Sequence, residues 1–291
     1  MPRRKFNLLD LQKEMEKGRP LTMVTAYDYP SGLLADRAEV DIILVGDSLG
    51  NVVLGLDSTV PVTMEQMLHH CRAVARGAEY AFLVGDMPFL SYQVSRREAV
   101  RNAGLLLKEG NVDGVKLEGG RAVAKTVKAI VAAGIPVMGH IGLTPQSISK
   151  LGGYRVQGRS SEGAIELLED ALALEESGCF ALVLEAIPAP VAKAISSRVG
   201  IPTFGIGAGP DCHGQVLVYH DILGMFDRFT PSFVKKYANL NEDIVVALSA
   251  FRDDVINRHF PATEHTYRLD EEVLADFQER LARHDADNRK H

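Results

Sequence analysis

The chain has 291 residues, of which 46% are hydrophobic and 24% are charged, a composition typical of an ordinary globular protein. Its formal net charge of −6 argues against a nucleic-acid-binding protein, because such proteins carry a basic surface. The longest nearly uncharged apolar stretch, residues 129–139, contains glycine and proline and is too short to span a bilayer.

The start of the chain and its cysteines favour a cytoplasmic protein. A basic beginning is followed by acidic residues such as Asp10 and Glu14, where a signal peptide would have its apolar segment. The three cysteines are widely spaced and form no Cys-x-x-Cys pair, which is typical of reduced thiols. We therefore expect a cytoplasmic chain.

Short apolar runs recur along the chain, and each ends in a glycine or a polar residue. Because these runs are continuous rather than alternating, they predict strands buried on both faces, as in a parallel sheet. An eighth strand has one candidate, residues 215–219, which follows the seventh with no room for a helix. The seven clearer strands are predicted at residues 21–27, 41–47, 80–86, 114–118, 136–140, 179–185 and 202–207.

The segments between the strands carry apolar stripes at helical spacing. Alternating strands and helices indicate an α/β fold, and eight such units would close a TIM (β/α)8 barrel. An open doubly wound sheet is the structural alternative, although its Gly-x-Gly-x-x-Gly dinucleotide motif is absent. The helices are predicted at residues 63–75, 95–109, 121–133, 161–177 and 189–199.

The pattern changes after residue 224. Residues 231–240 and 241–251 look helical, and the highly charged tail, residues 269–291, predicts an amphipathic helix. We therefore expect a single barrel domain at residues 1–257 and a charged C-terminal helical extension at residues 258–291.

Polar side chains follow the predicted strands at the end where a TIM barrel has its active site. The second and third strands both end in Leu-Val-Gly-Asp, which places Asp47 and Asp86 at the same level of the sheet. Lys116 and Glu118 are two residues apart on the fourth strand and therefore face the same side. We expect the three acids to converge around the lysine.

Three carboxylates gathered at one place repel each other unless a cation lies among them. Oxygen ligands alone suit a hard cation, which predicts Mg²⁺ with water and substrate completing its shell. The alternative is that each aspartate is only the N-cap of the next helix. Three acids at consecutive strand ends favour the metal site.

Two further strand ends carry candidate groups. Glu185 closes an apolar run, where a poorly solvated acid suits a general base; the alternative is a structural ion pair. His140 is either a functional group or a hydrogen-bonded structural residue. The glycine cluster at residues 205–209 predicts either a phosphate site or a tight turn.

Six motifs in chain order resemble the ketopantoate hydroxymethyltransferase family. The resemblance covers roughly residues 21–240, and residues 251–291 look like an extension beyond the common core. The motifs are Val24-Thr25-Ala26-Tyr27-Asp28, Val45-Gly46-Asp47-Ser48-Leu49-Gly50, Gly85-Asp86-Met87-Pro88-Phe89, Val115-Lys116-Leu117-Glu118-Gly119-Gly120, Gly139-His140-Ile141-Gly142-Leu143-Thr144-Pro145-Gln146 and Gly205-Ile206-Gly207-Ala208-Gly209.

The resemblance implies a barrel of the phosphoenolpyruvate mutase and isocitrate lyase group. It implies Mg²⁺-dependent transfer of a hydroxymethyl group from methylenetetrahydrofolate to 3-methyl-2-oxobutanoate, giving 2-dehydropantoate in pantothenate biosynthesis. It also implies a homo-oligomer, commonly a decamer.

By motif position, the resemblance also assigns roles to residues. Glu185 would accept the proton. The Mg²⁺ ligands would be Asp47, Asp86 and Glu118, and the keto acid would be held by Asp47, Ser48, Asp86 and Lys116, with His140 as a further substrate-site candidate.

Two other enzyme classes are weighed against this function. A related metal-dependent C–C bond lyase would use a similar barrel, but such lyases resemble each other in a Cys-Gly-His loop that is absent here. A phosphate-binding barrel isomerase would use the glycines at residues 205–209. A non-enzymatic binding barrel would not explain four acids and a lysine at strand ends.

Overall fold

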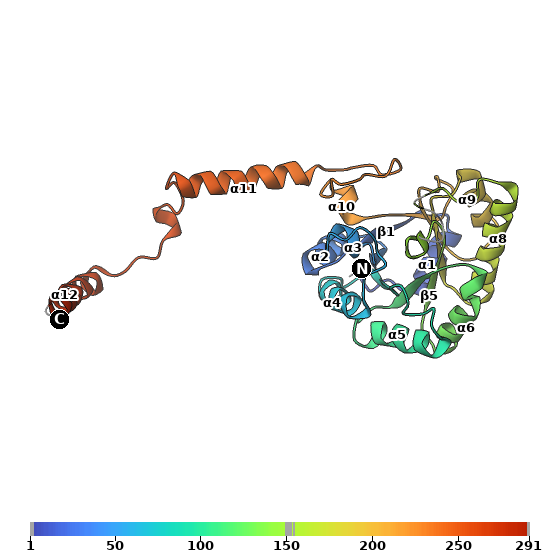
Figure 1. The fold of residues 1–291 in the computed structure, drawn as a ribbon, viewed down its shortest axis with the longest axis horizontal. Helices are drawn as coiled ribbons and strands as arrows, with labels where there is room; N and C mark the ends of the chain where they lie inside the picture. The colour runs from blue at the N-terminus through green and yellow to red at the C-terminus, as the bar shows by residue number, and fades with distance from the viewer. Residues whose placement is uncertain (1–2, 149–152, 154, 290–291) are drawn as a thin grey trace. The chain divides into compact units, whose positions relative to one another are not determined.

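The structure is a computed structural model that describes residues 3–148, 153 and 155–289. Eight parallel strands follow one another in sequence order and close into a barrel (Figure 1), which confirms the predicted TIM barrel. The strands are β1 (Leu21–Thr25), β2 (Ile42–Val45), β3 (Phe82–Asp86), β4 (Gly114–Glu118), β5 (Val137–Gly142), β6 (Ala181–Glu185), β7 (Thr203–Ile206) and β8 (Gly214–Leu217).

The eighth strand lies where the sequence offered its one candidate. β8 pairs with β1 on one side and with β7 on the other, so it closes the barrel although no helix separates it from β7. Its register with β1 runs from Leu21 opposite Gly214 to Val24 opposite Leu217.

Helices surround the barrel and pack on it through a buried apolar layer. Three of the N-caps, Thr63, Ser95 and Ser160, accept a hydrogen bond from the first turn of their helix. Among the described residues, the helical segments of this unit are α1 (Leu8–Glu16), α2 (Tyr29–Arg37), α3 (Leu49–Val52), α4 (Met64–Ala75), α5 (Arg96–Lys108), η1 (Arg121–Val123), α6 (Ala124–Ala132), η2 (Pro145–Ser147), α8 (Ser161–Glu176), α9 (Ala189–Ser196) and α10 (Tyr219–Ile222).

Side chains alternate between two cores along each strand. On β4, Val115 and Leu117 belong to the layer between strands and helices, whereas Lys116 and Glu118 line the mouth of the barrel. The barrel interior forms a separate apolar cluster, and Leu11 of α1 packs into it. This cluster lies beneath the polar mouth and makes the barrel a filled core rather than a pore.

The predicted helix at residues 231–240 is wrong. Residues 231–239 form turns and irregular chain, and the helix that follows begins at Leu240. The backbone N–H of Tyr237 donates to the carbonyl of Ile222 at 2.8 Å, so the end of this stretch is bonded to α10 instead of continuing a helical ladder.

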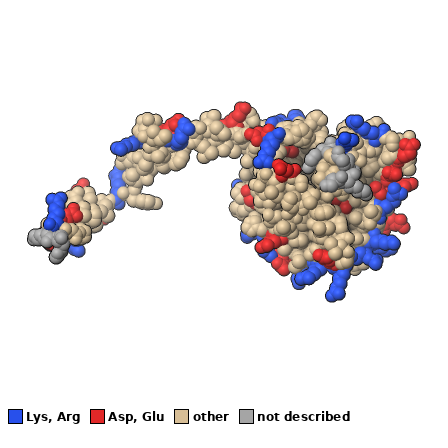
Figure 2. All heavy atoms as spheres, viewed as in Figure 1, with Lys and Arg blue, Asp and Glu red and all other residues tan. Residues whose placement is uncertain are grey.

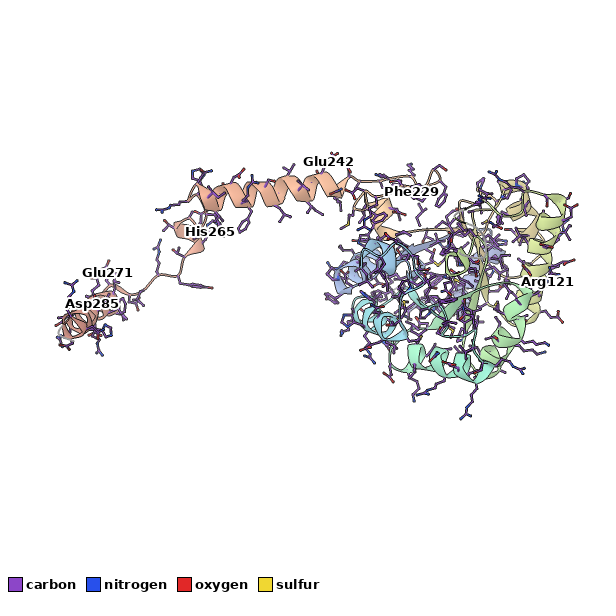
Figure 3. The ribbon with its side chains drawn as sticks, in the orientation of Figure 1. Arg121, Phe229, Glu242, His265, Glu271 and Asp285 are labelled. Carbon is purple, nitrogen blue, oxygen red and sulfur yellow. The ribbon has the colours of Figure 1, made fainter. Side chains whose placement is uncertain are left out.

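The chain divides into two compact units, Met1–Asn239 and Leu240–His291. The second unit contains α11 (Leu240–Ile256), η3 (Thr263–His265) and α12 (Glu271–Asn288), so α12 lies where the sequence predicted an amphipathic helix. Neither α11 nor α12 has a buried residue, and side chains such as Glu242 and Glu271 project outward (Figure 3). The predicted domain limit at residue 257 stays a prediction.

The surface of the barrel unit mixes both signs of charge. Figure 2 shows acidic and basic side chains interspersed over the visible face. None of the described helices is both long and apolar enough to cross a bilayer.

Candidate active site

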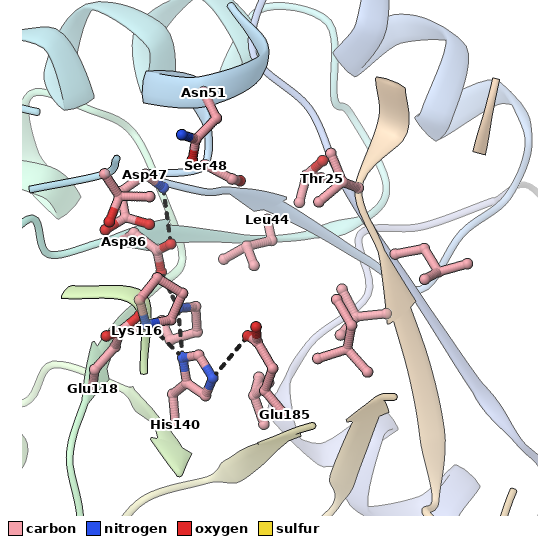
Figure 4. A pocket seen from close by; sticks show the side chains of 17 residues that line it. Thr25, Leu44, Asp47, Ser48, Asn51, Asp86, Lys116, Glu118, His140 and Glu185 are labelled. Atoms are coloured by element: carbon pink, nitrogen blue, oxygen red, sulfur yellow. Dashed lines mark hydrogen bonds and ion pairs between the residues drawn. The ribbon is translucent and has the colours of Figure 1, made fainter. Parts of the chain in front are cut away.

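A pocket of about 140 Å³ opens at the carboxyl ends of the strands (Figure 4). Apolar side chains of the barrel interior, among them Leu44, Val183 and Ile206, form part of its wall. All the predicted site residues line it together: Asp47, Ser48, Asp86, Lys116, Glu118, His140 and Glu185.

The strand register sets these side chains next to one another. Asp86 on β3 lies opposite Lys116 on β4, and Glu118 on β4 lies opposite His140 on β5. Glu185 ends β6 opposite Gly142. Residues distant in the chain thus reach one pocket because neighbouring strands end at the same level.

An ion pair joins the lysine to one of the acids. Lys116 Nζ lies 2.8 Å from Asp86 Oδ1, and both side chains are almost completely buried. The other oxygen of the same carboxylate, Asp86 Oδ2, accepts the backbone N–H of Asp47 at 3.0 Å. Asp86 therefore binds the lysine and the second strand end rather than capping a helix.

Burial and like charge disturb the ionisation of the acids. Burial raises the pKa of Asp47 well above its usual range, and the charges of Asp86 and Glu118 add to the shift. Burial also raises the pKa of Asp86, although the charge of Lys116 opposes it. Burial acts to raise the pKa of Glu118 as well, but the hydrogen bond and charge of His140 outweigh it and lower the pKa.

His140 links the acid cluster to Glu185. Its Nδ1 lies 3.3 Å from Glu118 Oε1, and its Nε2 lies 3.1 Å from Glu185 Oε2. Burial and the charge of Lys116 act to lower the pKa of His140, but the two glutamates outweigh them and raise it to about 9. The imidazole is therefore protonated at neutral pH and carries a second positive charge into the pocket.

Two residues of this network were absent from the predicted site. The hydroxyl groups of Tyr27 and Ser48 are 2.8 Å apart, so Tyr27 holds a predicted substrate-site residue. Gln146 on η2 donates from Nε2 to Asp47 Oδ2 at 2.8 Å. Both lie within quoted motifs, but nothing in their local sequence indicates contact with partners 21 and 99 residues away.

The donor set fits a hard divalent cation. Four acids and two basic side chains line the pocket, so negative groups are in excess. Among the described residues, no three His, Cys, Asp or Glu side chains already form a metal cage. A cation here would therefore take few ligands from the protein and the rest from substrate and water, as Mg²⁺ commonly does.

The glycines at residues 205–209 are explained by the backbone. Gly207 and Gly209 have φ of +63° and +81°, a region that disfavours side chains. A Cβ on Gly209 would lie 2.4 Å from the Cβ of Ala189, and one on Gly207 would lie 2.6 Å from the ring of Phe233. A tight turn packed against its neighbours accounts for both residues.

Comparison with solved structures shows the fold. Phosphonopyruvate hydrolase in complex with oxalate and Mg²⁺ has a TM-score of 0.57 at 14% identity, covering 97% of this chain and 98% of that one. A 2,3-dimethylmalate lyase, a member of the PEP mutase/isocitrate lyase superfamily, has a TM-score of 0.58 at 16% identity and covers 93% and 98%. These proteins share the barrel architecture with the chain.

Comparison of sequences is more specific. A 3-methyl-2-oxobutanoate hydroxymethyltransferase from Moorella thermoacetica is 61% identical over 266 residues, which cover 91% of this chain and 99% of that protein. One from Heliobacterium modesticaldum is 55% identical, with 90% and 95% covered. The family model of ketopantoate hydroxymethyltransferase matches residues 5–263. The chain belongs to the ketopantoate hydroxymethyltransferase family.

Proposed function

We propose that the chain transfers a hydroxymethyl group from methylenetetrahydrofolate to 3-methyl-2-oxobutanoate, giving 2-dehydropantoate, with Mg²⁺ as cofactor. Family membership supports the reaction, and the relatives named above carry that activity in their names. The observation that carries the proposal in the structure is the buried cluster of three acids around Lys116, with Glu185 on the other side of His140.

Asp47, Asp86 and Glu118 would hold the cation, which supplies Lewis-acid stabilisation to the keto acid when it is bound. Lys116 lies at the same place and would neutralise negative charge that develops on the substrate oxygen. Ser48, oriented by Tyr27, would donate to the substrate, and protonated His140 would add positive charge beside it.

Glu185 would remove the proton from C3 of the keto acid. It lines the pocket and is the most exposed of the four acids, with 17% of its side chain accessible, so substrate can reach it. His140 Nε2, 3.1 Å away, would hold the carboxylate in place while it receives the proton. Water would cleave the C–N bonds of methylenetetrahydrofolate and release the one-carbon unit as formaldehyde, leaving tetrahydrofolate. The enolate carbon would then form a C–C bond to that carbon, whose carbonyl oxygen takes a proton and becomes the hydroxyl of the product, so no protein nucleophile is needed.

The proposal is tested with the purified full-length chain and its two substrates. We expect 2-dehydropantoate to form in the presence of Mg²⁺ and its formation to stop when a chelator removes the cation. Product formation that is unaffected by chelation would contradict the role of the metal.

The proton step is tested by exchange in D₂O. Without folate, the wild-type protein with Mg²⁺ should exchange the C3 proton of 3-methyl-2-oxobutanoate, which proton NMR follows directly. Glu185→Gln keeps the size of the side chain but cannot accept the proton, so exchange should fall by about 10²- to 10⁴-fold. If the variant exchanges at the wild-type rate, Glu185 is not the base.

The cellular setting and assembly complete the proposal. The three cysteines are free thiols, which supports a reducing cytoplasm. Within its own unit, α11 leaves apolar side chains such as Val246 and Ile256 uncovered, which supports a homo-oligomer in which they are covered. The family resemblance gives a decamer as the expected size, and sedimentation velocity measures it.

A further inference from the structure

Gln146 bridges two of the proposed metal ligands. Its side-chain Nε2 donates to Asp47 Oδ2 at 2.8 Å, and its backbone N–H donates to Glu118 Oε2 at 3.0 Å. Only 4% of the residue is exposed, so water does not replace these bonds readily. One residue thus contacts one oxygen on each of two carboxylates.

The orientation of the Gln146 amide is fixed from both ends. Its Nε2 also donates to the carbonyl of Met87 at 3.0 Å, and its Oε1 accepts the hydroxyl of Tyr92 at 2.7 Å. Rotating the amide by 180° would bring Oε1 against the carbonyl oxygen of Met87, which offers no hydrogen. The N–H groups are therefore held toward Asp47 and Met87.

Tyr92 is in turn anchored on β4. The backbone N–H of Glu118 donates to the Tyr92 hydroxyl at 3.2 Å, and this hydroxyl also lies 3.1 Å from the carbonyl oxygen of Glu118. Tyr92 is 2% exposed, so the whole chain of bonds is buried. The network therefore ties the loop after β3, the end of β4 and η2 to one another.

We propose that Gln146, locked by Tyr92, is a positioning residue that orients Asp47 and Glu118 for the cation. Among the described residues, Asp47 Oδ1 receives no hydrogen bond, so the amide occupies one oxygen and leaves the other to face a ligand. The inference rests on the proposed function, because it presumes that these acids bind Mg²⁺. Polar groups that hold metal ligands in this way typically change metal affinity 10- to 100-fold when removed.

The experiment measures binding of Mg²⁺ alone to the full-length protein by titration calorimetry. Gln146→Leu removes the amide while keeping most of its volume, and we expect the Kd for Mg²⁺ to rise about 10- to 100-fold. Tyr92→Phe removes only the hydroxyl that locks the amide and should raise the Kd about two- to tenfold. If Gln146→Leu does not fold, Tyr92→Phe carries the test.

Thr203→Val serves as the matched control. It removes a buried hydroxyl that pairs with Ser196 Oγ at 2.7 Å at the start of β7, the opposite end of the strand from the pocket. We expect it to lower the melting temperature without changing the Kd for Mg²⁺. If Gln146→Leu and Tyr92→Phe behave in the same way, the positioning role is overturned and both residues are structural.

The two proposals fail in different ways. A wild-type protein that binds no Mg²⁺, with or without the keto acid, would overturn the proposed cofactor and this inference with it. Normal binding by wild type together with unchanged binding by both variants would overturn this inference alone.

Discussion

Lys116 is a buried cation held by a carboxylate that also faces the proposed substrate. Burial alone would lower its pKa, but the charges of Asp86, Glu118 and Asp47 outweigh burial and raise it, so the side chain remains charged at every ordinary pH. Lys116→Met should keep the length of the side chain but weaken keto-acid binding by about ten- to a hundredfold, the usual effect of a hydrogen bond to a charged group. Steady-state KM and calorimetry measure this change.

Lys193→Met is the matched control for that variant. Lys193 also pairs with an aspartate, Asp211 at 3.2 Å, but its side chain is 67% exposed and lies outside the pocket. The Lys193→Met variant should have the KM of wild type, since exposed ion pairs contribute little free energy. An unchanged KM in Lys116→Met would show that Lys116 has a structural role and does not bind the keto acid.

At the residue scale, the sequence predicts what lies at strand ends but not what lies between them. Asp47, Asp86, Lys116 and Glu118 could be predicted to converge, because parallel strands end at one level. Gln146 could not, because a neutral amide on a short 3-10 turn carries no pattern of its own. Gln146 contacts Asp47 only because folding brings η2 close to the end of β2.

The ends of β5 and β6 form a junction where a side chain has no room. Gly142 has a φ of +93°, and a Cβ placed on it would lie 2.2 Å from the carbonyl oxygen of Glu185. Gly142→Ala should therefore displace the end of β6 and its glutamate. Because a misplacement of about 1 Å can lower activity about 10²-fold, we expect a loss of that order in kcat/KM.

Gly134→Ala separates this effect from backbone strain. Gly134 has a similar φ of +83°, but nothing lies within 4 Å of its added Cβ. The Gly134→Ala variant should lose about 1–3 kcal/mol of stability, because its backbone is strained, and should keep the wild-type kcat/KM. Equal activity losses in the two variants would argue that the clash with β6 has no special effect.

Among the elements, the repeated strand–helix units were predictable because their apolar periodicity is strong. α1 was not predicted, since its contribution to the barrel interior is one fully buried leucine, Leu11. Residues 231–239 were predicted as helix and are not, because Tyr237 bonds to α10. Local periodicity describes an element well only where tertiary hydrogen bonds do not compete with it.

At the scale of the whole molecule, the groups of the candidate site all come from the first of the two units. Every group in the candidate site belongs to the unit Met1–Asn239, and α12 buries none of its residues. Truncation after Arg268 should therefore leave kcat/KM within about twofold of wild type, the factor that corresponds to the roughly 0.5 kcal/mol expected for changes away from buried features. Steady-state assays with and without residues 269–291 make the comparison, and a larger loss would mean that the tail supports the site.

The excess of buried acid has a consequence for the lifetime of the protein in a cell. Without a cation, like charges oppose the folded state, and a ligand that binds only the folded state stabilises it according to its concentration relative to Kd. If Asp47, Asp86 and Glu118 hold Mg²⁺, magnesium starvation increases the unfolded fraction as well as slowing the reaction. Proteases remove unfolded chains, so the amount of enzyme would follow the magnesium supply.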